Sequence, residues 1–235
     1  MIRRLLLGIL CAAAVGAPRS LAAQRGEISI LGGIVHSPGV EFDRVLRGSN
    51  LGPPLYVRQR GERSAGPAIG AAATFAIRGH VFAELGVMHH GVERAISATG
   101  LGDESGPFLI TNRYKGALTT LWAGPSYRVV DREWTALSAV LAPTVIVMTG
   151  DAFSTETVFH NFPSSNTTIG VLLGVRGRHW LNDRVGVQAS LDDVIWTFPL
   201  APHNADGTPF APLSSRKTPP QHDLRLHLGL ALRLR

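Results

Sequence analysis

The chain has 235 residues, a formal net charge of +6 and one cysteine. This length suits one domain, and a single cysteine excludes an internal disulfide framework. Basic residues never occur in a run of five or more, which argues against a nucleic-acid-binding protein.

The N-terminal segment has the three parts of a secretory signal peptide. Arg3 and Arg4 precede an apolar run at residues 5–15, and small residues follow at 20–23. We therefore expect residues 1–23 to be removed, which leaves a mature domain of residues 24–235 with a net charge of +3. Cys11 lies in the apolar run, so the mature chain has no cysteine. No later segment reaches the roughly 18 uninterrupted apolar residues of a membrane helix, so any membrane crossing must use strands.

Eight later segments have the period-two alternation of β-strands, in which successive side chains point to opposite faces. The last is the clearest, because six leucines alternate there with Arg225, His227, Gly229, Ala231, Arg233 and Arg235. It is also long enough to cross a bilayer as a tilted strand, which takes about 9–11 residues. In chain order the predicted strands are residues 27–35, 67–77, 80–92, 114–129, 134–148, 167–178, 184–198 and 222–235.

The connections alternate strictly between short and long. Tight turns are predicted at residues 78–79, 131–133 and 181–183, whereas long polar loops are predicted at 36–66, 93–113, 149–166 and 199–221. In a meander this alternation places every long loop at one rim, as in bacterial outer-membrane barrels. Parts of residues 55–59 and 156–160 could extend neighbouring strands beyond the bilayer.

The aromatic residues form two groups near opposite strand ends, which is typical of the girdles at the two membrane interfaces. One group lies beside the tight turns: Phe75, Phe82, Tyr127, Trp134 and Trp180. The other lies toward the long loops: Phe108, Tyr114, Trp196 and Phe198.

The face opposite the apolar one favours a membrane barrel over a soluble one. It carries small residues with isolated charges, and the whole chain has only two lysines, Lys115 and Lys217. A soluble barrel would expose a face rich in Lys and Glu, whereas small residues suit the narrow interior of an eight-stranded barrel. The fold class we predict is an all-β, antiparallel, up-and-down transmembrane β-barrel of about eight strands.

On this pattern the mature chain resembles the small eight-stranded outer-membrane proteins of Gram-negative-type bacteria, the OmpA/OmpX-like barrels. The resemblance implies a bacterial outer-membrane location and contact with outer-membrane lipid and lipopolysaccharide. It also implies assembly by the barrel-assembly machinery through the C-terminal strand, and a monomeric state. The chain departs from the family in ending on Arg235 where an aromatic residue is usual. Pro125 and Pro143 fall within strands and predict a bulge or a strand end.

Charges on the inward face are the candidate site residues. Glu27 and Glu84 are expected to pair with Arg176, Arg225 and Arg233, because a charge inside a barrel must be paired or solvated. We interpret these five as a structural ion-pair network rather than the lining of a pore, since eight strands leave a lumen that side chains fill.

No catalytic, cofactor-binding or metal-binding residues are predicted. His89 with His90, and Asp192 with Asp193, are adjacent on strands and must point to opposite faces. The arginines of the first long loop could contact glycolipid phosphates or an acidic partner, but we prefer the interpretation of a solvated loop. We expect a non-enzymatic protein with an envelope-structural or surface-interaction role. A Ser–His–acid cluster on one rim would instead indicate a lipid-modifying outer-membrane enzyme, and a hollow apolar interior would indicate a soluble lipocalin-like carrier.

Overall fold

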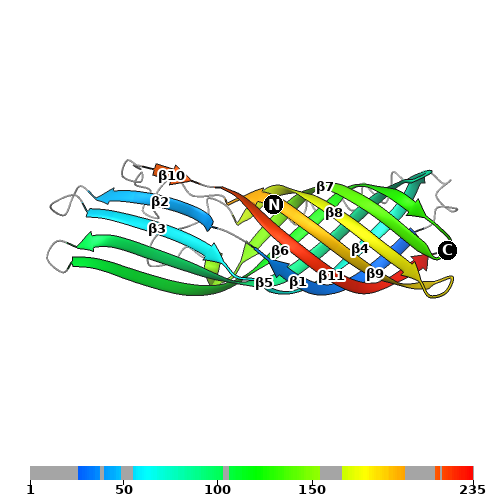
Figure 1. Ribbon diagram of the computed structural model, residues 1–235, viewed down its shortest axis with the longest axis horizontal. Coiled ribbons are helices and arrows are strands. Elements are labelled where there is room, and N and C mark those ends of the chain that lie inside the picture. The colour runs from blue at the N-terminus through cyan, green and yellow to red at the C-terminus, as the bar shows by residue number, and fades with distance from the viewer. Residues whose placement is uncertain are drawn as a thin grey trace.

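The protein forms a closed antiparallel barrel of eight strands with a smaller sheet projecting from one end (Figure 1). The eight strands are β1 (Gly26–His36), β4 (Gly66–Arg78), β5 (Val81–Gly102), β6 (Gly106–Asp131), β7 (Thr135–Thr149), β8 (Thr167–Trp180), β9 (Val185–Thr197) and β11 (Pro220–Leu234). The structure is a computed structural model that describes residues 26–37, 40–48, 55–102, 106–153, 166–198, 215–217 and 219–234. The predicted signal peptide and residues 156–160 lie outside this part of the chain, as does Arg235.

Each barrel strand pairs with the next barrel strand along the chain, and β11 pairs with β1 to close the cylinder. The closing ladder runs from Gly26 opposite Leu234 to His36 opposite Leu224. Tight turns join β4 to β5, β6 to β7 and β8 to β9, so all three lie at the same end. The predicted eight-stranded up-and-down barrel is confirmed.

The barrel wall is apolar outside and polar inside. From Leu224 to Leu234 of β11 every second residue is an exposed leucine, with exposed fractions from 41% at Leu234 to 67% at Leu228. The alternate positions Arg225 and His227 are buried. Exposed leucines on every outward position are stable against lipid and costly against water, so this is the arrangement of a transmembrane β-barrel. It contradicts the soluble carrier, which requires an apolar interior. Among the described residues, no helix is long and apolar enough to span a bilayer.

β5 and β6 continue well past the barrel. Their outer parts, together with β2 (Val40–Gly48), β3 (Leu55–Arg63) and β10 (Ser215–Lys217), form what we call the projecting sheet. β5 leaves β4 after His90, and its residues 94–100 pair with β3. β3 pairs with β2, and β2 pairs with the short strand β10. Residues 106–116 of β6 complete the sheet on the other side of β5. Figure 1 shows these strands together to the left of the barrel.

The projecting sheet corrects the prediction of loops at residues 36–66, 93–113 and 199–221, since β2, β3, β10 and the outer parts of β5 and β6 lie in these ranges. Within these ranges the sequence indicates a possible strand only at residues 55–59. The signal used for the barrel strands was an apolar face toward lipid, and strands outside the bilayer need no such face. Their polar composition therefore predicts loops, although their backbones pair with neighbouring strands.

The two prolines interrupt one ladder without producing a bulge. The β6–β7 pairing stops after Trp122 opposite Thr144 and resumes at Ser126 opposite Val140 in the same register. Pro125 and Pro143 lie in the unpaired interval, and neither can donate a backbone hydrogen bond. Register shifts occur elsewhere, between Ala76 and Arg78 and between Arg128 and Val130. The predicted bulge or strand end at the prolines is therefore wrong, because β6 and β7 both continue through these positions and lose only the local pairing.

The closing seam depends on two glycines. A Cβ atom on Gly33 would lie 2.0 Å from the backbone oxygen of Leu226, and one on Gly229 would lie 2.0 Å from that of Ile30. Such distances are far inside van der Waals contact, so the β1–β11 approach requires glycine at both positions.

Among the side chains that the structure describes, aromatic residues face outward at one end of the barrel wall only, and the side chain of Phe108 lies outside this set. Beside the tight turns, Phe75, Tyr127 and Trp134 are exposed on the wall. At the other end, Trp196 and Phe198 are buried in the lumen and do not face lipid, and Phe82 and Trp180 are also inside. The girdle prediction used only the distance of each aromatic residue from a strand end. Parity along the strand places Phe82 on the same inward face as Glu84, and Trp180 on that of Arg176.

Candidate functional site

The lumen is filled with polar and charged side chains, which makes it the first place to look for function. Arg94, Arg176 and Arg225 are among the largest fully buried side chains in the described part of the protein. The buried carboxylates there are Glu27, Glu84, Asp192 and Asp223. The four carboxylates and their arginine partners form three clusters along the barrel axis, whereas Arg94 donates to the backbone oxygen of Ala152 at 2.8 Å.

The first cluster lies toward the tight turns and is centred on Glu27 of β1. The Nη2 atom of Arg128 donates to its two carboxylate oxygens at 3.0 and 3.1 Å, and Arg178 donates to Oε2. Arg178 also donates to Thr74 at 3.0 Å and to the side chain of Gln188 at 2.6 Å. These residues come from five strands, so the cluster connects strands on different sides of the barrel through its interior.

The second cluster lies near the middle of the barrel around Arg176 of β8. Its guanidinium donates to Glu84 at 3.0 Å and to Asp192. The indole of Trp122 donates to the same oxygen of Glu84 at 3.0 Å. His227 lies 3.7 Å from Asp192. The guanidinium is therefore held between two carboxylates, as a buried cation requires.

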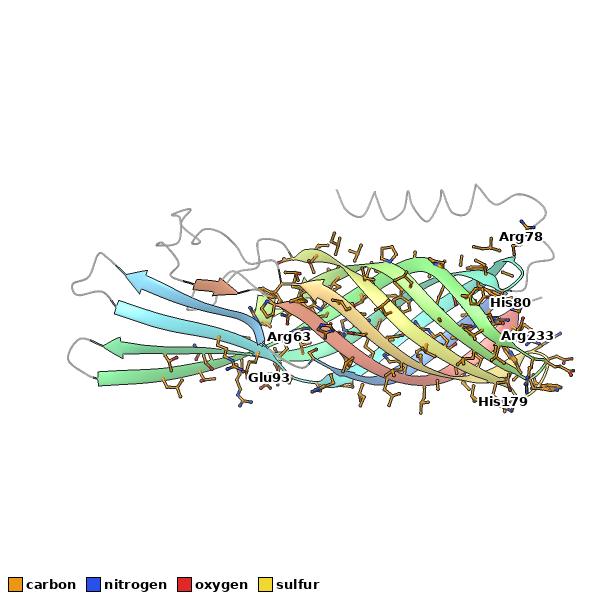
Figure 2. The ribbon with its side chains drawn as sticks, turned by 45° about the horizontal axis from the view of Figure 1, so that its top comes forward. Arg63, Arg78, His80, Glu93, His179 and Arg233 are labelled. Atoms are coloured by element: carbon orange, nitrogen blue, oxygen red, sulfur yellow. The ribbon has the colours of Figure 1, made fainter. Side chains whose placement is uncertain are left out.

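The third cluster, which we call the Asp223 cluster, lies at the mouth and consists of Ser37, Arg63, Trp196 and Asp223. Ser37, Arg63 and Trp196 contact the Asp223 carboxylate. Beside it, Arg225 donates to Thr120 at 2.6 Å and approaches Asp223 at 3.9 Å. Figure 2 shows Arg63 where the barrel meets the projecting sheet.

The structure buries four of the five predicted site residues in the lumen, and one of the expected pairs is formed there. Glu84 contacts Arg176 as expected, but Glu27 contacts Arg128 and Arg178. Arg225 lies near Asp223 and not near either predicted glutamate.

Arg233 is a correction. It is only partly buried and lies at the tight-turn end (Figure 2), where its guanidinium is 4.1 Å from the centroid of the Trp180 ring. The reason is its place near the end of β11, where the lumen opens to solvent and the cation can remain partly hydrated.

Several residues of these clusters were missed by sequence reasoning. Arg128 and Arg178 lie within the predicted strands 114–129 and 167–178, and following the alternation to the end of each strand places both on the inward face. Arg63 could not be found in this way, because it was predicted to lie in a loop without alternation.

The adjacent pairs point to opposite faces as expected. His90 is buried in the lumen, whereas His89 is exposed and contacts Thr119 at 3.0 Å. Asp192 faces the lumen, and Asp193 contacts His222 at 2.9 Å on the outer wall. No group of three or more potential metal ligands occurs within the residues that the structure describes.

One arrangement contains the residue types of a catalytic triad. His227 lies between Ser190 and Asp192, but the same ring nitrogen, Nδ1, is 3.5 Å from the serine and 3.7 Å from the aspartate. A relay needs the acid on one ring nitrogen and the nucleophile on the other. All three residues are also buried in mid-barrel, so the cluster lacks both the geometry and the access of a hydrolase site.

Among the residues that the structure describes, the charged side chains at the middle level of the lumen are not exposed to solvent. Glu84, Arg176, Arg225 and His227 each expose 1% of their surface or less. A water-filled pore would leave such side chains accessible to solvent. The described side chains therefore fill the barrel, as expected for eight strands.

Comparison with known proteins gives no close relative. No protein-family model matches the chain, and no curated protein sequence matches it significantly. Among solved structures, the outer membrane protease OmpT from Escherichia coli matches with 8% identity and a TM-score of 0.33, over 92% of this chain and 98% of that one. A Pseudomonas aeruginosa FadL homologue matches with 8% identity and a TM-score of 0.24, over 94% of this chain and 92% of that one. The similarity is too low to support an argument about function.

Proposed function

We propose that this is a non-enzymatic protein of the bacterial outer membrane, in which a filled barrel anchors a sheet for interactions at the cell surface. The observation that carries this proposal is the continuation of β5 and β6 past the barrel. β5 has 22 residues and β6 has 26, whereas the other barrel strands have between 11 and 15. A barrel that served only to span lipid would need no strand of that length.

The edge of the projecting sheet supports an interaction role. Among the described residues, no strand pairs with β6 over residues 106–116 on the side away from β5. An open edge presents unpaired backbone N–H and C=O groups and can accept an added strand from a partner. Leu109 and Arg113 on this segment are 69% exposed and 72% exposed in the side chain, respectively.

The membrane part of the proposal is supported by the apolar outer face and by the tight turns at one end. In outer-membrane barrels short turns are periplasmic and long loops are extracellular, so the projecting sheet would face outward from the cell. The proposal includes four further points. The barrel is of the OmpA/OmpX-like kind, it contacts lipopolysaccharide, it is assembled through β11, and it is a monomer.

The location is tested by cysteine labelling in intact cells, because the mature chain has no cysteine of its own. Thr111→Cys places a thiol on the projecting sheet, and Asp183→Cys places one in a tight turn at the opposite end; both positions are exposed. A membrane-impermeant maleimide should label the first variant in intact cells and the second only after permeabilisation. The reverse result, or labelling of neither, would overturn the proposed orientation.

Two further measurements test the non-enzymatic, filled barrel. The mass spectrum of the lipid A fraction should be unchanged when the protein is expressed, and a shifted acyl composition would revive the enzyme alternative. In planar bilayers the purified barrel should give no stepwise conductance, and regular steps would contradict a filled lumen.

A further inference from the structure

The Asp223 carboxylate lies at the mouth of the barrel with both of its oxygens occupied. Oδ1 accepts hydrogen bonds from the Ser37 hydroxyl at 2.6 Å and from Nη2 of Arg63 at 3.0 Å. Oδ2 accepts one from the Trp196 indole at 3.1 Å. The side chains of Asp223 and Arg63 are 0% and 1% exposed, so these are buried and charge-assisted contacts.

The contacts come from the points where the chain enters and leaves the projecting sheet. Ser37 directly follows β1, where the chain departs toward β2, and Arg63 is the last residue of β3, where it returns. Trp196 lies at the end of β9 and Asp223 near the start of β11, on either side of the segment that contains β10. The Arg63 guanidinium also stacks 4.7 Å from the centroid of the Trp196 ring.

We propose that Asp223 is the positioning residue that fixes the β2–β3 hairpin, and with it the projecting sheet, relative to the barrel. The functional meaning of this inference rests on the surface role proposed above. The hairpin joins the barrel through short connections and through the pairing of residues 57–63 with β5. A buried carboxylate that binds both ends of the hairpin removes the freedom that these connections leave.

A second lumen carboxylate, Asp192, provides a comparison within the same barrel. Asp192 is also buried, at 3% exposure, and also binds a buried arginine. Its contacts, Arg176 and His227, both belong to barrel strands, and neither leads into the projecting sheet. Asp192 thus fills and stabilises the lumen without reaching the hairpin, which makes it a matched control.

The test compares Asp223→Asn with Asp192→Asn in the full-length barrel reconstituted in phospholipid vesicles. Hydrogen exchange of the backbone, read by mass spectrometry, is followed separately for β2–β3 and for the barrel strands. Loss of charge-assisted contacts should accelerate exchange in β2–β3 by about tenfold or more in Asp223→Asn. In Asp192→Asn we expect less than about a twofold change there, because the hairpin contacts are intact.

Trypsin gives an independent readout, since the hairpin contains Arg44, Arg47, Arg58 and Arg60. Cleavage after these residues should be faster in Asp223→Asn than in Asp192→Asn, while the barrel core stays resistant. If Asp223→Asn does not fold, Arg63→Gln removes the hairpin's own contact and should give the same local increase.

Unchanged exchange in β2–β3, or an equal increase in the Asp192→Asn control, would overturn the proposal. Both readouts use purified protein and need no partner. A loosened hairpin would therefore support the role of Asp223 even if surface labelling failed, and the labelling could succeed with the hairpin unaffected.

Discussion

Arginine substitutions along β11 should reveal the depth of each leucine in the membrane. The outward leucines extend from Leu224 to Leu234, ten residues apart. At a rise of about 3.3 Å per residue this is roughly 33 Å along the strand. With a tilt of about 40° it is roughly 25 Å along the barrel axis, which equals the apolar band of an outer-membrane barrel. Leu228 and Leu230 then lie within about 3 Å of the bilayer midplane, and Leu224 and Leu234 at its two edges.

Leu228→Arg and Leu230→Arg should each lower the free energy of unfolding by about 2–4 kcal/mol, because a cation at the midplane must be desolvated. Leu224→Arg and Leu234→Arg should cost only about 0–1 kcal/mol, since the side chain reaches the interface. The matched control is Leu109→Arg on the projecting sheet. Leu109 is as exposed as Leu228, at 69% against 67%, and should tolerate arginine at a cost below about 1 kcal/mol.

The assay is reversible urea unfolding of the barrel in phospholipid vesicles, followed by tryptophan fluorescence. A cost that peaks at Leu228 and Leu230 and falls toward both ends is the expected profile. A flat profile, or a gain in stability at Leu228, would refute the reasoning, because an exposed leucine in water loses little on replacement by arginine.

Three more experiments test the interior and the wall. Glu84→Gln should lower the unfolding free energy in the same assay by about 3 kcal/mol, the low end for breaking a buried pair, because Asp192 still contacts Arg176; no loss would mean that the pair is solvated. Pro125→Ala with Pro143→Ala should restore two ladder donors and raise stability by about 0.5–1.5 kcal/mol per bond, with slower hydrogen exchange in β6 and β7; faster exchange would show that the prolines are needed there. Gly33→Ala should lower the free energy of unfolding by about 1–3 kcal/mol, and Gly32→Ala by much less, since a Cβ on Gly32 has nothing within 4 Å. Samples are heated in SDS to a series of temperatures before the gel is run, and the temperature at which the folded band disappears is compared. An equal fall in that temperature for both variants would contradict the close approach at the seam.

The sequence could predict which charged residues face the lumen but not which of them contact one another. The sequence placed Glu27, Glu84, Arg176 and Arg225 on the inward face, because an inward position follows from parity along a strand. It could not name the partner of Glu27, since Arg128 and Arg178 are 101 and 151 residues away along the chain. Which side chains meet across a barrel depends on strand tilt and stagger, and no local pattern records these.

The class of fold was determined by the sequence alone. Leucines at every second position and alternating short and long connections allow few other structures, because each strand must present one apolar face to lipid and one face to a narrow interior. Tertiary structure alone decided how far the strands extend and what lies at the mouth. β2, β3 and the outer halves of β5 and β6 leave the bilayer and lose the apolar face that made the other strands recognisable. Arg63 therefore became part of the Asp223 cluster only because a hairpin with no membrane signal folds back onto the barrel and places its last residue in the lumen.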